Sequence, residues 1–172
     1  MESKAKLLGH PVHPMLIVFP LGLLATSVIF DMIGLAGDIR SLSMASFWMI
    51  AAGLVSAILS AIFGLVDWLA IPDRTRAKQM GFWHGSGNGL VIVLFAISWI
   101  LRRPSPEHPS IIALLLEVAG ALIAPVTAWL GGELVDRLGM GVDDGAHLNA
   151  PNSLSGRPAR GAEVRDDVKR AA

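Results

Sequence analysis

Four long hydrophobic blocks, separated by short polar segments, dominate the first 138 residues of the chain. They predict helices over about residues 14–35, 44–71, 82–101 and 110–138. Apolar blocks longer than about 18 residues are typical of transmembrane helices. We therefore predict an all-α polytopic membrane protein in which residues 1–138 form a four-transmembrane-helix bundle.

The two ends of the chain have different characters. The first block follows a mildly basic start, as in a signal peptide, but it is too long for one and contains Pro20 and Asp31. It is therefore interpreted as a retained helix. Residues 139–172 are rich in Gly, Asp, Asn, Pro, Ser and Arg, which predicts a flexible tail.

Four spans put both termini on one membrane face, called side A; the opposite face is side B. The short connections on side A carry more basic residues than those on side B. Side A has Lys4, Lys6, Arg74, Arg76, Lys78 and Arg137, and side B has Arg40, Arg102 and Arg103. Because positive charge is enriched in cytoplasmic loops, side A is predicted to be cytoplasmic, with a cytoplasmic tail.

Composition agrees with a membrane protein and narrows the chemistry. Hydrophobic residues make up 53% of the chain and charged residues 16%, whereas soluble domains carry roughly 25% charged residues. The chain has no cysteine, which excludes disulfides, thiolate zinc sites, cysteine-ligated iron–sulfur clusters and c-type haem attachment. Its formal net charge is zero, so no nucleic-acid partner is indicated.

Polar side chains from all four predicted helices converge on side A. The set comprises His10, His13, Asp67, His84, Asn88 and Glu133. Ionisable groups in membrane segments usually face the bundle interior in pairs. Histidine with carboxylates suits a proton site or a first-row metal site. The candidate metal ligands are His10, His13, Asp67, His84 and Glu133. The candidate haem-binding pair is His13 and His84.

Three interpretations of this set stay open: a purely structural polar network, a bound metal or b-type haem, and a proton or ion path. Asn88 lies on the same helix face as His84, four residues away. It is a candidate to hydrogen-bond a ligand residue or to take part in a proton path. Asp31 and Glu117, towards side B, are candidates for the same path. Ion pairing with Arg40, Arg102 or Arg103 is the favoured role for these two acids.

The two halves of the chain share a pattern. Each is a helical hairpin that opens on side A with histidine and ends there with glycine and an acid. The matching ends are Gly64-Leu65-Val66-Asp67-Trp68 and Gly132-Glu133-Leu134-Val135. Two hairpins of equal orientation can be related by an axis along the membrane normal, which would place the cluster between the halves.

The chain resembles the bacterial DUF2231 family of predicted membrane proteins over roughly residues 7–143. Four sequence features carry the resemblance: Gly9-His10-Pro11-Val12-His13-Pro14, Gly64-Leu65-Val66-Asp67-Trp68-Leu69, His84 with Asn88, and the stretch from Leu116-Glu117-Val118-Ala119-Gly120 to Gly131-Gly132-Glu133-Leu134-Val135. The resemblance implies a multi-pass protein of the bacterial inner membrane and names no activity. Some relatives carry an attached domain similar to Rieske iron–sulfur proteins, which implies redox partners.

We expect a small membrane subunit that binds a transition metal or haem b at the cytoplasmic end of its bundle, for electron transfer or metal handling. Its expected partners are the lipid bilayer and either a redox membrane complex or a second copy of the chain. The alternatives are a proton-coupled carrier or channel and a scaffold subunit without a site. An enzyme is not favoured, because Ser86 beside His84 lacks the Gly-x-Ser-x-Gly context of a nucleophile.

Overall fold

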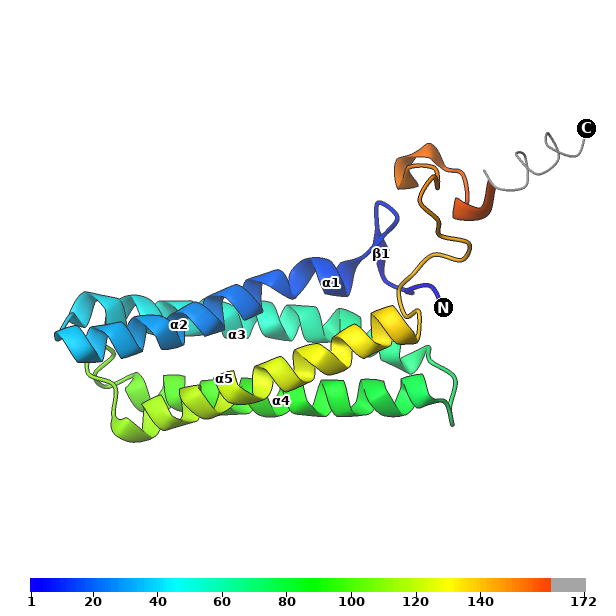
Figure 1. The fold of residues 1–172 in the computed structure, drawn as a ribbon. Coiled ribbons are helices and arrows are strands. Elements are labelled where there is room, and N and C mark those ends of the chain that lie inside the picture. The colour runs from blue at the N-terminus through cyan, green and yellow to red at the C-terminus, as the bar shows by residue number, and fades with distance from the viewer. Residues whose placement is uncertain (162–172) are drawn as a thin grey trace, which may run out of the picture.

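The computed structural model describes residues 1–161. Four long helical spans lie side by side in an up-and-down bundle (Figure 1). The first is α1 (Val12–Leu16) with α2 (Val18–Gly37), and the others are α3 (Arg40–Leu69), α4 (Arg76–Arg102) and α5 (Ile111–Gly132). The predicted all-α, four-helix membrane bundle is confirmed.

Helix boundaries differ from the boundaries of the hydrophobic blocks where a capping side chain or a proline sets them. Helix α4 begins six residues before its block, because the Thr75 hydroxyl accepts a hydrogen bond from the Lys78 amide and caps a polar first turn. The first span is broken at Ile17, three residues before Pro20. Proline has no N–H to give to the Leu16 carbonyl, and its ring clashes with that carbonyl.

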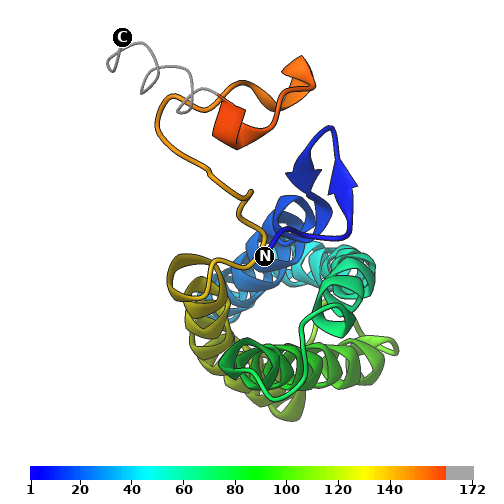
Figure 2. The ribbon, with the colours of Figure 1, turned by 90° about the vertical axis from the view of Figure 1, so that its right-hand side faces the viewer.

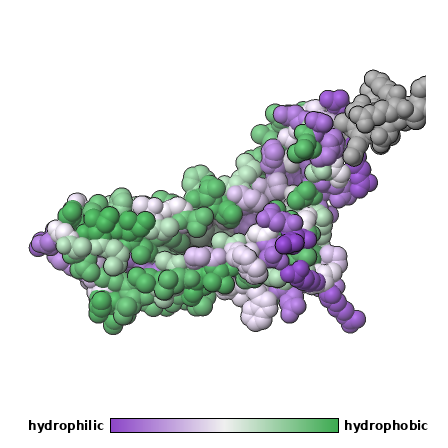
Figure 3. All heavy atoms as spheres, viewed as in Figure 1, coloured by the Kyte–Doolittle hydropathy of each residue, from purple (hydrophilic) through white to green (hydrophobic). Residues whose placement is uncertain are grey.

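The surface of the bundle is suited to lipid. Large hydrophobic side chains remain exposed along all four spans, among them Phe19, Trp48, Leu122 and Trp129. Figure 3 shows this apolar surface along the helices and hydrophilic residues at the end that carries the N-terminus. In water such a surface would be an aggregation liability, whereas in a bilayer it faces acyl chains.

The interior of the bundle is built from residues three or four apart on each helix, as in a coiled coil. On α4 this stripe consists of His84, Asn88, Val91, Phe95, Ser98 and Arg102. Leu24, Ile50, Val91 and Phe95 form the apolar core at mid-bundle. Small residues dominate the stripes of α3 and α5 and let the helices approach closely.

Short irregular elements lie at the side A end of the bundle (Figure 2). Strands β1 (Lys6–Leu7) and β2 (His10–Pro11) form a two-stranded hairpin. At its turn Leu8 and Gly9 both have positive φ, which a primed two-residue turn requires. After α5 a π-helix, η1 (Glu133–Arg137), ends the last span, and two 3-10 turns follow, η2 (Ser153–Ser155) and η3 (Ala159–Gly161).

Candidate functional site

Two histidines from opposite halves of the chain meet inside the bundle near side A. His13 lies on α1 and His84 on α4, and both side chains are partly buried. Their ring centroids are 6.3 Å apart with the planes at 88°. The predicted pairing of these two residues in space is therefore present in the fold.

Each imidazole is held by a backbone carbonyl of the next long span along the chain. His13 Nδ1 lies 2.9 Å from the Ser60 carbonyl oxygen on α3, and His84 Nδ1 lies 2.8 Å from the Thr127 carbonyl oxygen on α5. A carbonyl can only accept, so both Nδ1 atoms carry the proton. In the neutral form of each ring Nε2 then has a lone pair, as a metal ligand must.

Glycine makes these carbonyls accessible. In an α-helix the Cβ of residue i+4 tilts towards the N-terminus and covers the carbonyl of residue i. Gly64 follows Ser60 by four residues, and Gly131 follows Thr127 by four. A Cβ at Gly64 would lie 2.9 Å from His13 Nδ1, and one at Gly131 would lie 3.0 Å from His84 Cε1.

A side-chain network surrounds the second imidazole. The Asn88 amide nitrogen lies 3.3 Å from His84 Nε2, and the Asn88 oxygen accepts a 3.0 Å hydrogen bond from the Thr127 hydroxyl. Since the amide nitrogen can only donate, this network assigns His84 Nε2 as an acceptor. Asn88, which the sequence placed beside His84, thus contacts both the imidazole and Thr127.

The same contacts recur in both halves of the chain at constant sequence offsets. His84 follows His13 by 71 residues, whereas Thr127 follows Ser60 and Gly131 follows Gly64 by 67. The equivalence extends to mid-bundle, where Leu24 packs on Gly53 as Phe95 packs on Gly120. The two hairpins are thus built alike, and the histidine pair lies between them.

The other predicted ligands are not part of this pair. His10 is exposed on β2, with Nε2 3.3 Å from the Ser153 hydroxyl. Glu133 binds Arg76 at 2.8 Å. In residues 1–161 no three His, Asp or Glu side chains gather as a metal site would need, so the structure does not form the predicted five-residue ligand cluster.

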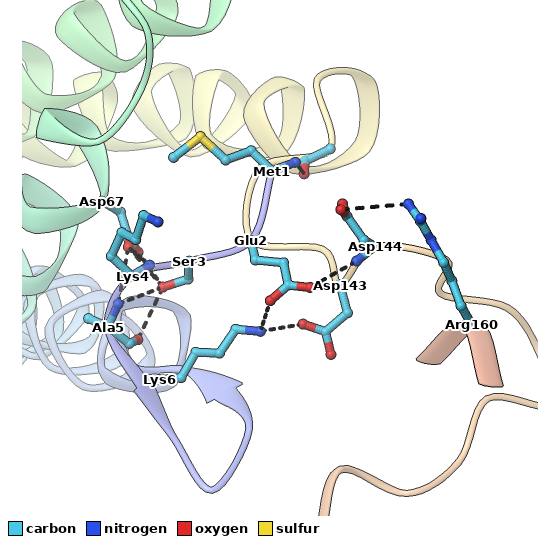
Figure 4. Close-up of polar contacts among 11 residues, drawn as sticks. Met1, Glu2, Ser3, Lys4, Ala5, Lys6, Asp67, Asp143, Asp144 and Arg160 are labelled. Carbon is cyan, nitrogen blue, oxygen red and sulfur yellow. Dashed lines mark hydrogen bonds and ion pairs between the residues drawn. The ribbon is translucent and has the colours of Figure 1, made fainter. Parts of the chain in front are cut away.

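Asp67 holds the N-terminal segment instead (Figure 4). Its carboxylate accepts hydrogen bonds of 2.8 Å from the Ser3 hydroxyl and 2.7 Å from the Lys4 amide. Next to it, Lys6 bonds both Glu2 and Asp143, and the Met1 ammonium donates to the Gly139 carbonyl. These contacts dock the first residues onto side A and onto the start of the segment that was expected to be a flexible tail.

These side A charges titrate differently from free side chains. The hydrogen bond from Lys6, the Asp144 amide and the positive charge of Lys6 lower the pKa of Glu2. The hydrogen bonds to Asp143 and Glu2 raise the pKa of Lys6. The Glu2–Lys6–Asp143 contact is thus an electrostatic clasp between the N-terminal segment and the residues that follow η1.

A second polar layer lies towards side B. Arg102 binds Asp31 through Nη1 at 2.6 Å and Nη2 at 2.9 Å, and binds Glu117 through Nη1 at 2.8 Å. All three side chains are at most 1% exposed. Both acids therefore lie against an arginine, as predicted. Sequence reasoning did not anticipate that Arg102 lies inside the bundle and serves both.

A family model described as "Predicted membrane protein (DUF2231)" matches residues 9–144. No curated protein and no solved structure matches the chain.

Proposed function

The chain belongs to the DUF2231 family of predicted membrane proteins, and we propose that it carries a b-type haem between His13 and His84 and serves electron transfer near side A. The observation that carries this proposal is the histidine pair itself. Two imidazoles, each fixed through Nδ1 to a neighbouring helix, approach from opposite halves of the bundle to 6.3 Å between centroids.

The separation of the rings suits two ligands on one metal ion. A metal–imidazole bond is about 2.0–2.1 Å, so two imidazoles that bind one ion from opposite sides have centroids roughly 6 Å apart. The hydrogen bonds at Nδ1 fix the tautomer and the ring orientation, as the partners of metal-bound histidines do. Binding of the ion at His84 Nε2 would displace the 3.3 Å contact of the Asn88 amide, which would keep its 2.9 Å hydrogen bond to the His84 carbonyl.

The donor set favours haem over a non-haem metal. A non-haem site needs three or more protein ligands, and among the described residues only the two imidazoles meet here. A porphyrin would supply four nitrogen ligands itself, so His13 and His84 would be sufficient to hold a haem. The interior residues of α3 and α5 at this level are small, namely Ala57, Ser60, Gly64, Ala124, Thr127 and Gly131.

Two features argue against a transmembrane proton or ion path. The apolar core of Leu24, Ile50, Val91 and Phe95 separates the histidines from the acids near side B. Asp31 and Glu117 both contact Arg102, and all three side chains are buried. A proton or ion path would have to cross both the apolar core and the buried acid–arginine layer. Electron transfer from a haem near side A would cross neither.

The orientation and partners follow from the same proposal. Arg102 is buried and no longer counts as a side B loop charge, so the excess of basic residues on side A is larger than the sequence suggested. Side A is thus proposed to face the cytoplasm of a bacterial cell, in the inner membrane. An electron carrier of this size requires a redox partner, which we propose to be a membrane complex that approaches side A.

The experiment is a visible spectrum with haem and elemental analysis on the full chain, purified in detergent after expression with added haem. We expect a Soret band that shifts reversibly on reduction. His13→Ala and His84→Ala should lose it, whereas the control His10→Ala, which alters an exposed histidine outside the pair, should keep it.

Three outcomes would overturn the proposal. Folded wild-type protein without a Soret band excludes the haem. A stoichiometric metal without a Soret band would replace the haem with a non-haem centre. Equal loss in His10→Ala and His84→Ala would show that the band does not report on this pair.

A further inference from the structure

The side B layer contains one more carboxyl group than it has cations. Asp31 comes from α2, Arg102 from α4 and Glu117 from α5. The other groups that face them are uncharged: the hydroxyls of Ser46 and Ser98, and the carbonyl oxygens of Ser43 and Pro106. Within the described chain, each acid's ion pair is with Arg102 alone. Two ionised carboxylates would therefore leave one net negative charge in a closed site.

Such a charge is costly at this position. Ionisable side chains inside a membrane protein pair with one another or change their protonation, because an unpaired charge cannot be solvated there. The three side chains are at most 1% exposed, and no ordered cation other than the guanidinium contacts them among residues 1–161. Neutrality requires one bound proton.

The hydrogen bonds distinguish the two carboxyl groups. Asp31 receives both terminal nitrogens of Arg102, one on each oxygen, and the Ser46 hydroxyl. Glu117 receives Arg102 and Ser98 on the same oxygen, Oε1, at 2.8 and 2.5 Å. Its other oxygen, Oε2, is buried and has no partner. This oxygen lacks a partner in either protonation state, and a neutral O–H there costs less than an unsolvated negative charge.

We propose that the Asp31–Arg102–Glu117 layer is a buried proton-binding site, with the proton on Oε2 of Glu117. Asp31 is the ionised partner of Arg102, and Glu117 is a neutral carboxylic acid that accepts hydrogen bonds through Oε1. The layer then has no net charge. Loss of the proton breaks the O–H bond at Oε2, leaves the electron pair on Glu117 and gives the layer one negative charge.

The site lies close enough to side B to exchange its proton there. Glu117 is six residues from the start of α5, or about 9 Å at about 1.5 Å per residue. Arg102 is the last residue of α4, and its Nη2 donates to the Pro106 carbonyl in the loop that follows. Opening of this loop would expose the layer to side B water without disturbing the apolar core or the histidine pair.

Two isosteric substitutions in the full chain test the assignment. Glu117→Gln replaces a neutral acid with a neutral amide, so the thermal midpoint of unfolding in detergent should stay close to that of the wild type. Asp31→Asn removes the ionised partner of Arg102, so its midpoint should fall clearly. Equal destabilisation by the two substitutions, or failure of Glu117→Gln to fold, would overturn the proposal.

Infrared spectroscopy tests the proton directly. At neutral pH the wild type should show the C=O stretching band of a protonated carboxylic acid, above the amide I band, and Glu117→Gln should lose it. Glu107→Gln, at an exposed acid in the side B loop, is the matched control and should keep the band. A wild-type spectrum without this band, or a band that survives in Glu117→Gln, would overturn the proposal. Neither readout depends on haem.

Discussion

Replacing Gly64 with alanine tests the support of the histidine pair. The new Cβ would lie 2.9 Å from His13 Nδ1 and 3.0 Å from Cε1, closer than real Cβ atoms approach neighbouring atoms. The backbone of α3 is fixed by its own hydrogen bonds, so the imidazole has to move. Movement takes Nδ1 away from the Ser60 carbonyl, which lies 2.9 Å away in the native contact.

The magnitude follows from two opposing contributions to the free energy of unfolding. Alanine is better than glycine inside a helix by about 0.5–1 kcal/mol. A buried donor that loses its acceptor costs about 1–3 kcal/mol. Gly22→Ala isolates the first contribution, because nothing lies within 4 Å of a Cβ there. We therefore expect Gly64→Ala to be about 1–3 kcal/mol less stable than Gly22→Ala.

The assay is reversible unfolding in mixed micelles, with the Soret absorption recorded on the same samples. Gly131→Ala should behave like Gly64→Ala but more mildly, since its Cβ would lie 3.0 Å from His84 Cε1 and 3.3 Å from Nδ1. Gly132→Ala is its neighbouring control, with nothing within 4 Å. Equal stability of Gly64→Ala and Gly22→Ala, with an unchanged spectrum, would refute the proposed role of these glycines.

Two further predictions concern side A. Asp67→Asn should weaken the hydrogen bonds from Ser3 and the Lys4 amide, so hydrogen exchange of the first residues should accelerate while the helices stay protected; unchanged exchange would contradict this. The clasp of Glu2 and Lys6 should hold only at intermediate pH. The lowered pKa of Glu2 means that its contribution is present above its unfolded pKa and is lost as pH falls through the folded one. The raised pKa of Lys6 means that its contribution is present below its unfolded pKa and is lost as pH rises through the folded one. Exchange of residues 139–145 should therefore increase at both extremes of pH, and a flat profile would contradict the clasp.

The bundle could be predicted from the sequence because lipid imposes a simple rule. Every backbone group in the membrane must be hydrogen-bonded, which only helices and closed β-barrels achieve, and apolar blocks of about 20 residues fit helices rather than the shorter strands of a barrel. The helix ends were less predictable, since they depend on single side chains. The Thr75 cap, for example, starts α4 in a polar stretch that an apolar pattern does not include.

The site was predictable only where topology alone brings residues together. His13 and His84 begin inward-facing stripes on two helices that start on the same side, so the alternating spans bring them to one level. Asp67 and Glu133 lie near the same end of the bundle, but their rotation about the helix axis decides their partners. Asp67 instead meets the N-terminal segment and Glu133 meets Arg76. Sequence spacing near a helix end does not encode these contacts.

The comparison of the two hairpins explains why the two polar layers differ. Arg102 occupies the position 71 residues after Asp31, the same offset that relates the histidines, and Glu117 lies 67 residues after Ile50. If the halves were identical at this level, two aspartates would face each other across the axis without a cation. Arginine at one of the two positions turns that repulsion into a bidentate pair, and Glu117 then accepts the remaining donor of Nη1. The imidazoles and the carbonyls that hold them repeat in both halves, and the proposed haem would use this repeated arrangement. The side B layer does not repeat, and the proposed proton lies on one half of it.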